Sequence, residues 1–318
     1  MAGWLTRWLG AITIGAALLA GLGACGPVRA VCGEGAPPER LADRPPLVYT
    51  CLLQRHGEAW HHNLFELTRP GAVRLTDRFA EDEGPAADPT GSRLAYSTTL
   101  QGAPEIYVAN ADAQHPVAHG VAPGGQSDPA WSPDGRSIVY ASGQDGLHHP
   151  LGVAGSESHL YVLTVSGDHT RRLTDGPTYD AEPAWSRTGG RIAFTTDRDG
   201  RFEIASVNPQ GGALEILTSS GGARWPTWSP NGKQIAFQST ADADGSGPAA
   251  IWVMDADGSH SHEVTDGAEP AWSPDGKWIA FVRSTPVGTD LWMIPPAGGK
   301  VVRLTDDAGT KHRPTWLS

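Results

Sequence analysis

Histidine is the residue type in this sequence with the clearest potential for chemistry, because neutral imidazole is a common ligand of zinc and copper. Two short segments carry several histidines. The first contains His56, His61 and His62, and the second contains His148 and His149. If the fold brings the segments together, they offer a candidate metal site made of His61, His62, His148 and His149. Solvated loop histidines are the competing interpretation, because two adjacent imidazoles do not easily bind one ion.

Two acidic loops have carboxylates at alternate positions, a spacing that suits calcium. They are Asp-Arg-Asp-Gly at 197–200 and Asp-Ala-Asp-Gly at 242–245. Neither continues to the distal Glu of an EF-hand, so ordinary β-turns are the favoured interpretation. The sequence also has no Gly-x-Ser-x-Gly, Gly-x-x-x-x-Gly-Lys, Cys-x-x-Cys or His-Glu-x-x-His motif. We therefore predict a protein without enzymatic activity and without a cofactor.

An internal repeat defines the elements that would position these residues. Its clearest copy is Pro-Ala-Trp-Ser-Pro-Asp-Gly at 129–135, followed by Ser-Ile-Val-Tyr at 137–140. Equivalent positions are 44, 54, 43, 44 and 44 residues apart, at Ala87, Trp131, Trp185, Trp228, Trp272 and Trp316. The long interval contains an insertion around 143–158. A period near 44 residues with short alternating segments is typical of a four-stranded propeller blade.

Each copy predicts four strands. Pro-x-Trp is a short inner strand, and Ser-Pro-Asp-Gly is a tight turn in which Pro sets φ and Gly accepts a positive φ. The Ile-Ala-Phe segment is the second strand, and alternating apolar residues predict third strands at 160–163, 202–205, 251–254 and 291–294. A Leu-Thr-Asp or Val-Thr-Asp segment ends the fourth. We attribute the repeated Trp to packing between neighbouring sheets rather than to ligand binding.

The two ends of the repeat region are complementary. Residues 47–53, 63–68 and 73–77 predict three strands that lack an inner one, whereas Pro314-Thr315-Trp316 is an inner strand without a blade. Joining them closes a ring and removes the exposed edges. The sequence therefore predicts an all-β, six-bladed propeller with four antiparallel strands per blade, at 47–83 with 314–318, 84–127, 128–182, 183–225, 226–269 and 270–313.

These motifs resemble a known family. The Pro-Ala-Trp-Ser-Pro-Asp-Gly-x-x-Ile-Ala-Phe unit, the Thr-Asp-Arg-Asp-Gly loop at 196–200 and the Met-Asp-Ala-Asp-Gly turn at 254–258 are similar to the WD40-like, or PD40, repeats of TolB propellers. The resemblance covers residues 47–318 and implies a six-bladed TolB-like propeller. TolB proteins carry an α/β domain before the propeller, whereas a short tether precedes the first strand in this sequence. We therefore do not extend the role of that domain in the Tol-Pal system to this chain.

The inner strands of a propeller line its axis, so the residues just before them should surround one opening of the channel. These residues are Gly84, Asp128, Glu182, Trp225, Glu269 and Arg313. We call the five that carry side chains, together with the neighbouring His312, the axial mouth. The side chains at these equivalent positions differ from one another, although the rest of the repeat is regular. Such variation indicates a functional site carried by a structural scaffold. A hydrated rim without a ligand is the alternative. The acids give the mouth a negative bias, and Trp225 is a candidate interface anchor.

The N-terminal segment 1–24 predicts a lipoprotein signal peptide. Arg7 is its only charge, an apolar stretch follows, and Leu-Gly-Ala-Cys ending at Cys25 resembles a bacterial lipobox. We expect Cys25 to carry lipid and to become the N-terminus. Ordinary cleavage after Ala30 and an uncleaved apolar anchor are the alternatives. Gly26 in place of a retaining Asp makes the outer membrane a plausible destination if the host has one.

A Pro- and Gly-rich tether is predicted at 25–46. With Cys25 lipidated, Cys32 and Cys51 remain as an even pair in an oxidising compartment. A disulfide between them would attach the tether to the first strand. Two unpaired thiols, with Cys51 acting as a small buried apolar residue, are the open alternative.

The function predicted from these features is binding of an envelope protein or peptide. The net charge of −11 argues against nucleic acid as a partner. We expect a monomer in the periplasm, at the outer membrane or on the extracytoplasmic face of the cell membrane, attached through its N-terminal lipid. The alternative is an enzyme or carbohydrate-binding propeller with a site at the axial channel, metal-assisted through the histidines.

Overall fold

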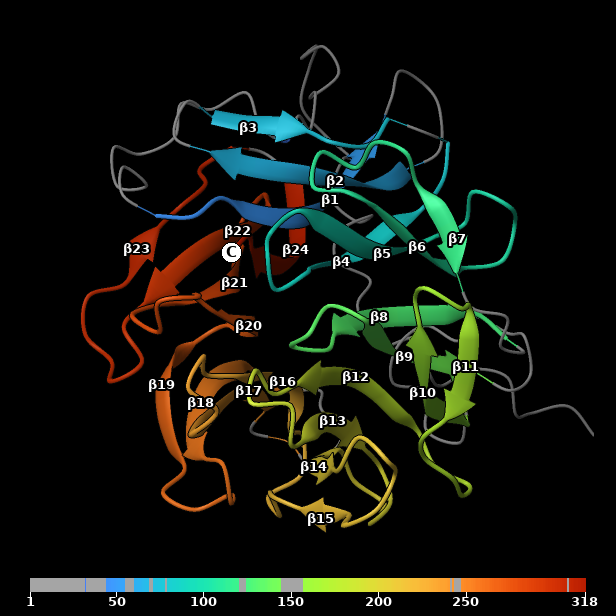
Figure 1. Ribbon diagram of the computed structural model, residues 1–318. Coiled ribbons are helices and arrows are strands. Elements are labelled where there is room, and N and C mark those ends of the chain that lie inside the picture. The colour runs from blue at the N-terminus through green and yellow to red at the C-terminus, as the bar shows by residue number, and fades with distance from the viewer. Residues whose placement is uncertain are drawn as a thin grey trace, which may run out of the picture.

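The computed structural model describes residues 32, 44–54, 60–68, 71–77, 79–119, 124–143, 157–240, 242, 247–307 and 309–318. Within these residues, all regular secondary structure is β-strand, and the sheets are arranged around a central axis (Figure 1). The predicted signal peptide, Cys25 and nearly all of the predicted tether lie outside the described residues. In the part of the chain that is described, no helix has the length and apolar character needed to cross a membrane.

Four of the sheets contain four strands each, in sequence order. Their neighbouring strands are antiparallel, as the alternating segments predicted. The strands are β4 (Asp82–Ala87), β5 (Arg93–Thr98), β6 (Glu105–Asn110), β7 (Val117–His119), β8 (Gln126–Trp131), β9 (Ser137–Gly143), β10 (Ser158–Thr164), β11 (His169–Arg172), β12 (Asp180–Trp185), β13 (Ile192–Thr196), β14 (Glu203–Val207), β15 (Glu215–Ile216), β16 (Arg224–Trp228), β17 (Gln234–Thr240), β18 (Ala249–Asp255) and β19 (His262–Asp266).

A fifth sheet has eight strands and joins both ends of the propeller. Its strands are β20 (Ala268–Trp272), β21 (Ile279–Thr285), β22 (Gly288–Ile294), β23 (Val302–Arg303), β24 (Gly309–Trp316), β1 (Leu47–Gln54), β2 (Trp60–Thr68) and β3 (Gly71–Arg74). Two parallel residue pairs between β22 and β24 connect its two halves, and each half has four strands. The propeller fold is thus confirmed, while the number of six blades stays our interpretation of this joined sheet.

The C-terminal strand closes the ring. β24 pairs antiparallel with β1, with Leu47 opposite Trp316 and Cys51 opposite Lys311. The Trp316 indole N–H donates to the Ala271 carbonyl of β20 at 3.1 Å, so this strand also contacts its other neighbour. The complementary ends predicted from the sequence therefore do meet.

The hydrophobic core lies between neighbouring sheets. Trp131 of β8 packs with Ile106 of β6 and Ile138 of β9. Its indole N–H donates to the Ala86 carbonyl of β4 at 3.1 Å, across the sheet boundary. Trp228 of β16 makes the equivalent bond to the Ala184 carbonyl of β12, two sheets further along the ring, at 3.1 Å. The repeated Trp is a packing residue, as predicted.

The Ser-Pro-Asp-Gly segments form the predicted turns. The Ser132 hydroxyl donates to Asp134 Oδ1 at 2.6 Å, and the Gly135 N–H donates to the Ser132 carbonyl at 2.9 Å. Gly135 has a φ of 66°, a value at which a Cβ would be strained. The Asp side chain of this motif is therefore used by the turn itself.

The strand β2 starts earlier than the sequence predicted. β2 begins at Trp60, not at residue 63, so His61 and His62 lie in a strand and not in the loop that we expected. The register pairs them with Leu53 and Leu52 of β1. The prediction missed this because two polar residues interrupt the apolar alternation at the strand end.

A disulfide joins Cys32 to Cys51 of β1, with the two Cα atoms 6.5 Å apart. Both cysteines are buried in the hydrophobic cluster beneath the closing strand. A Cβ at Gly309, the first residue of β24, would lie 2.6 Å from the Cys32 sulfur. The missing side chain at Gly309 thus lets β24 lie directly over the disulfide.

Candidate functional site

A β-bulge occurs at the equivalent position of every inner strand. In each case the strand register shifts at the residue before the Pro of the repeat. The shifted residues all have left-handed φ values, which are 60°, 54°, 55°, 55°, 52° and 51° at Gly84, Asp128, Glu182, Trp225, Glu269 and Arg313. These residues lie inside the inner strands, whereas the sequence predicted them just before the strands, because each strand continues past the bulge. A bulge re-aims a side chain, and a left-handed non-Gly residue costs about 1–2 kcal/mol. The bulges therefore turn the predicted ring residues toward the axis.

An axial cavity of about 420 Å³ lies inside this ring. All six bulge residues line it, together with the Pro and Trp residues of the inner strands. The set predicted from the sequence therefore surrounds one cavity, with His312 adjacent to it in β24.

Arg313 is the central cation of the axial mouth. Its guanidinium lies 2.8 Å from Asp128 Oδ1 and 3.7 Å from Glu83 Oε2. It also packs over the Trp225 ring, with its central carbon 4.8 Å from the ring centroid. A Cβ at Gly84 would lie 3.0 Å from Arg313 Nη1, so the glycine leaves room for the side chain to extend from β24 to β8. Arg313 thereby connects two inner strands that both pack against β4.

Glu182 is buried and fully partnered. It forms an ion pair with Arg224, accepts the Thr195 hydroxyl at 2.6 Å and accepts the Trp225 backbone N–H at 3.0 Å. This carboxylate therefore positions the bulge of the next inner strand. Sequence reasoning missed Arg224, although the residue directly precedes the ring position Trp225.

Glu269 connects β20 to the closing strand. One of its oxygens accepts the Arg313 backbone N–H at 2.5 Å, and the other lies 3.4 Å from His312 Nδ1. Burial favours the neutral acid, but His312 and Arg313 outweigh it, so the pKa of Glu269 lies below its usual value. At Asp128, burial and the nearby Glu182 charge raise the pKa, and Arg313 opposes them.

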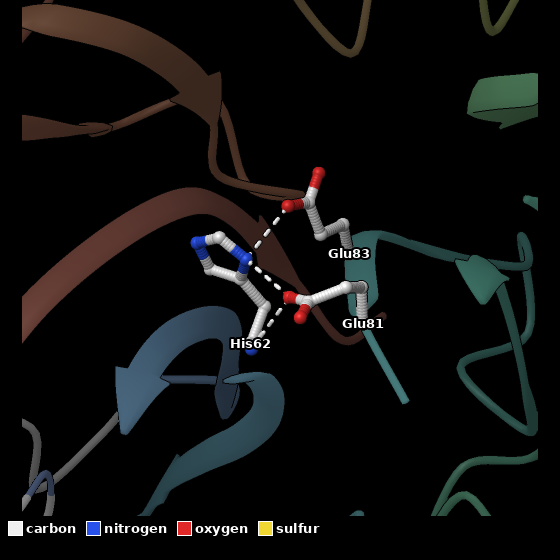
Figure 2. Close-up of side chains that lie close together, drawn as sticks. All are labelled: His62, Glu81 and Glu83. Carbon is white, nitrogen blue, oxygen red and sulfur yellow. Dashed lines mark hydrogen bonds and ion pairs between the residues drawn. The ribbon is translucent and has the colours of Figure 1, made fainter. Parts of the chain in front are cut away.

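A second cluster lies beside the axial mouth and contains His62, Glu81 and Glu83 (Figure 2). His62 Nδ1 is 2.8 Å from Glu81 Oε2 and 2.8 Å from Glu83 Oε1. Burial disfavours the charged imidazole, but the hydrogen bonds and charges of the two glutamates outweigh it and raise the pKa of His62 to about 9. His61 contacts the other oxygen of Glu81 at 3.1 Å.

Some of the predicted histidines therefore share a neighbourhood. The His62 ring lies 6.4 Å from the His312 ring, so this part of the predicted histidine group lies next to the mouth. His56, His148 and His149 lie outside the described residues. Glu81 and Glu83 were not among the residues predicted from the sequence. Their signal is the alternation of two carboxylates immediately before the ring position Gly84.

The acidic loop at 197–200 is a β-turn. Asp197 Oδ1 accepts the Tyr179 backbone N–H at 2.7 Å, and the Gly200 N–H donates to the Asp197 carbonyl at 2.8 Å. The first carboxylate is thus engaged with the backbone, in agreement with the favoured interpretation. Of the loop at 242–245, the structure describes only Asp242.

The fold and its repeats place this chain in a known family of propellers. The model of the TolB β-propeller domain, PD40, matches residues 85–318, and the chain belongs to this family. The structure is similar to TolB from Acinetobacter baumannii, with a TM-score of 0.68, 18% identity, and coverage of 89% of this chain and 68% of that one. It is also similar to a putative TolB from Agrobacterium tumefaciens, with a TM-score of 0.62, 26% identity, and coverage of 79% and 90%.

Two curated relatives match parts of the chain. An uncharacterized peptidase of Bacillus subtilis is 25% identical over 54% of this chain and 31% of its own length. An uncharacterized protein of Agrobacterium fabrum is 31% identical over 43% of this chain and 45% of its own length. The chain thus spans less than half the length of either relative. The resemblance to TolB repeats that the sequence suggested is confirmed at the level of family and fold.

Proposed function

We propose that this chain is a non-enzymatic binding protein of the cell envelope, and that its axial mouth receives a segment of a protein or peptide. The observation that carries the proposal is the ring of structurally equivalent bulges with unlike side chains around the axial cavity. A scaffold alone would not require five non-Gly residues in a left-handed conformation at one opening, because glycine adopts it without strain. Membership of the TolB propeller family supports a protein partner.

The charges around the mouth indicate the chemistry of the partner. Among the described residues there, carboxylates outnumber the paired cations. The carboxylates belong to Glu81, Glu83, Asp128, Glu182 and Glu269, and the cations are His62, Arg224 and Arg313. Trp225 is half-buried and offers an aromatic surface beside Arg313. A basic or amide-rich segment of a partner would complement this negative potential. Its association rate with the mouth should therefore fall as the salt concentration rises.

The proposed location follows from the N-terminal sequence. Lipid at Cys25 would hold the propeller at a membrane through the tether at 25–46, and Gly26 is compatible with the outer membrane. We propose that the mature protein acts as a monomer, because a ring whose ends pair with each other offers no open sheet edge at the closure.

The proposal is tested by capturing partners from solubilised membranes and then measuring their affinity for variants. Combined Trp225→Ala and Glu269→Gln should reduce the affinity of a specific partner at least tenfold. The matched control is Arg136→Ala with Lys277→Ala, which alters exposed residues of turns at the other end of the inner strands. Unchanged affinity in the mouth variant, with loss in the turn variant, would place the binding surface on the opposite face.

A further inference from the structure

The cluster beside the axial mouth has the composition of a metal site. His62 Nδ1 and one oxygen each from Glu81 and Glu83 lie within 4.8 Å of one another. Figure 2 shows the two carboxylates converging on the same ring nitrogen. The side chains are 25%, 38% and 27% exposed, so an ion and its water ligands can reach them from solvent.

The local backbone accounts for this convergence. Glu81 and Glu83 flank Asp82 at the start of β4, and alternate residues of a strand project to the same side. Asp82 itself is buried on the other side. β2 brings His62 opposite the two carboxylates, because β2 packs next to β4 across the boundary between two sheets.

Further groups hold both carboxylates in position. Glu81 Oε2 accepts the backbone N–H of His62 at 3.0 Å, and its Oε1 lies 3.1 Å from His61 Nδ1. The second oxygen of Glu83 faces Arg313 at 3.7 Å. Such outer contacts orient the ligands of metal sites.

We propose that His62, Glu81 and Glu83 bind one divalent transition-metal ion, with zinc as the preferred ion. Imidazole and carboxylate are both ligand types that zinc takes, and three protein ligands leave a fourth position for water. Bonds of about 2.1 Å at tetrahedral angles separate ligand atoms by roughly 3.4 Å. The two 2.8 Å contacts of His62 Nδ1 therefore need to open by only about 0.6 Å, and all three ligand atoms already lie within 4.8 Å of one another. The imidazole disfavours calcium, which takes oxygen ligands.

This inference does not depend on the proposed function, but it concerns the same region. Glu83 is shared between His62 and Arg313, so an ion at the cluster alters the charge that Arg313 faces at the mouth. The metal would therefore connect the edge of the mouth to its central cation.

The experiment is calorimetric titration of the purified full chain with ZnCl₂, followed by the same titration of variants. We expect one zinc per chain and a dissociation constant at least tenfold higher in His62→Ala and in Glu83→Gln. The matched control is His260→Ala. His260 forms a 2.8 Å pair with the single carboxylate of Asp255, and its loss should leave zinc binding unchanged.

A spectroscopic readout accompanies the affinities. Cobalt(II) added in place of zinc should give visible absorption of a low-symmetry site in the wild type and the His260→Ala variant, and lose it in the Glu83→Gln variant. Circular dichroism shows whether each variant is folded, and Glu83→Gln decides the question if His62→Ala does not fold. Equal zinc affinity of the wild type and Glu83→Gln, or no binding to the wild type, would overturn the proposal.

Discussion

Single carboxylates join neighbouring elements around the axis of this propeller. Glu182 forms an ion pair with Arg224 and accepts hydrogen bonds from a hydroxyl and a backbone N–H. Glu269 accepts a hydrogen bond from a backbone N–H and lies beside His312. Charges are buried at acceptable cost only when they are paired and hydrogen-bonded, and these residues satisfy both conditions. The axial mouth is therefore a connected network in which each acid holds a bulge or a strand in place.

Glu269 makes this network sensitive to acid. Its pKa in the folded protein lies below the usual 4.5, so its contribution to stability is present above that pH and is lost as pH falls through the folded-state pKa. We expect Glu269→Gln to lower the free energy of unfolding by about 1–3 kcal/mol at pH 7. The difference from the wild type should shrink below about pH 4.5 in urea titrations at several pH values. A difference that stays constant down to pH 3 would contradict this role.

The C-terminal strand β24 joins elements from both ends of the propeller. It pairs antiparallel with β1 and parallel with β22. Its Lys311 is fully buried and lies 3.2 Å from Asp290 of β22 and 3.1 Å from Asp307. The strand thus fastens the N-terminal strands to the last repeat, and its removal exposes both sides of the closure.

Deletion of residues 314–318 should therefore destabilise the whole propeller. It removes Trp316, which is buried and hydrogen-bonded to β20, and loss of such a side chain alone costs about 3–5 kcal/mol. The melting temperature measured by calorimetry should fall well below that of the full chain. Trp228→Ala is the control, because it removes the equivalent contact elsewhere in the ring. If the truncated chain melts like the full chain while Trp228→Ala does not, the closure contributes no stability.

The whole molecule is a ring of sheets with a charged axial cavity and an N-terminal segment that predicts attachment to a membrane. Several acyl chains at Cys25 would give stable attachment without a spanning helix. We expect Cys25→Ser to move the protein from the membrane fraction to the soluble fraction or to leave its precursor uncut. Fractionation and mass measurement of the N-terminus check this outcome. Gly26→Ala retains the lipidated residue and should stay attached. Normal processing and attachment of Cys25→Ser would refute lipidation.

Much of the fold could be predicted from the sequence because its signals are local and repeated. The turn at 132–135 needs only Ser, Pro, Asp and Gly in order, and the strands follow from alternating apolar residues. The ring positions were identified as the residues just before each inner strand, but neither the bulges nor their left-handed conformation was predicted. The extent of β2 was mispredicted, because cross-strand pairing extended it into polar residues that local pattern assigns to a loop.

The amino-acid sequence by itself thus determined the repeat, the closure and which residues surround the axis, since each depends on neighbours within one repeat or on a visible gap at its ends. Only the tertiary structure decided which of these residues touch. Arg313 meets Asp128, and His62 meets Glu81 and Glu83, across the boundaries between different sheets. Such contacts depend on the curvature of the ring and on the side-chain directions that the bulges impose, and no spacing along the chain encodes either quantity.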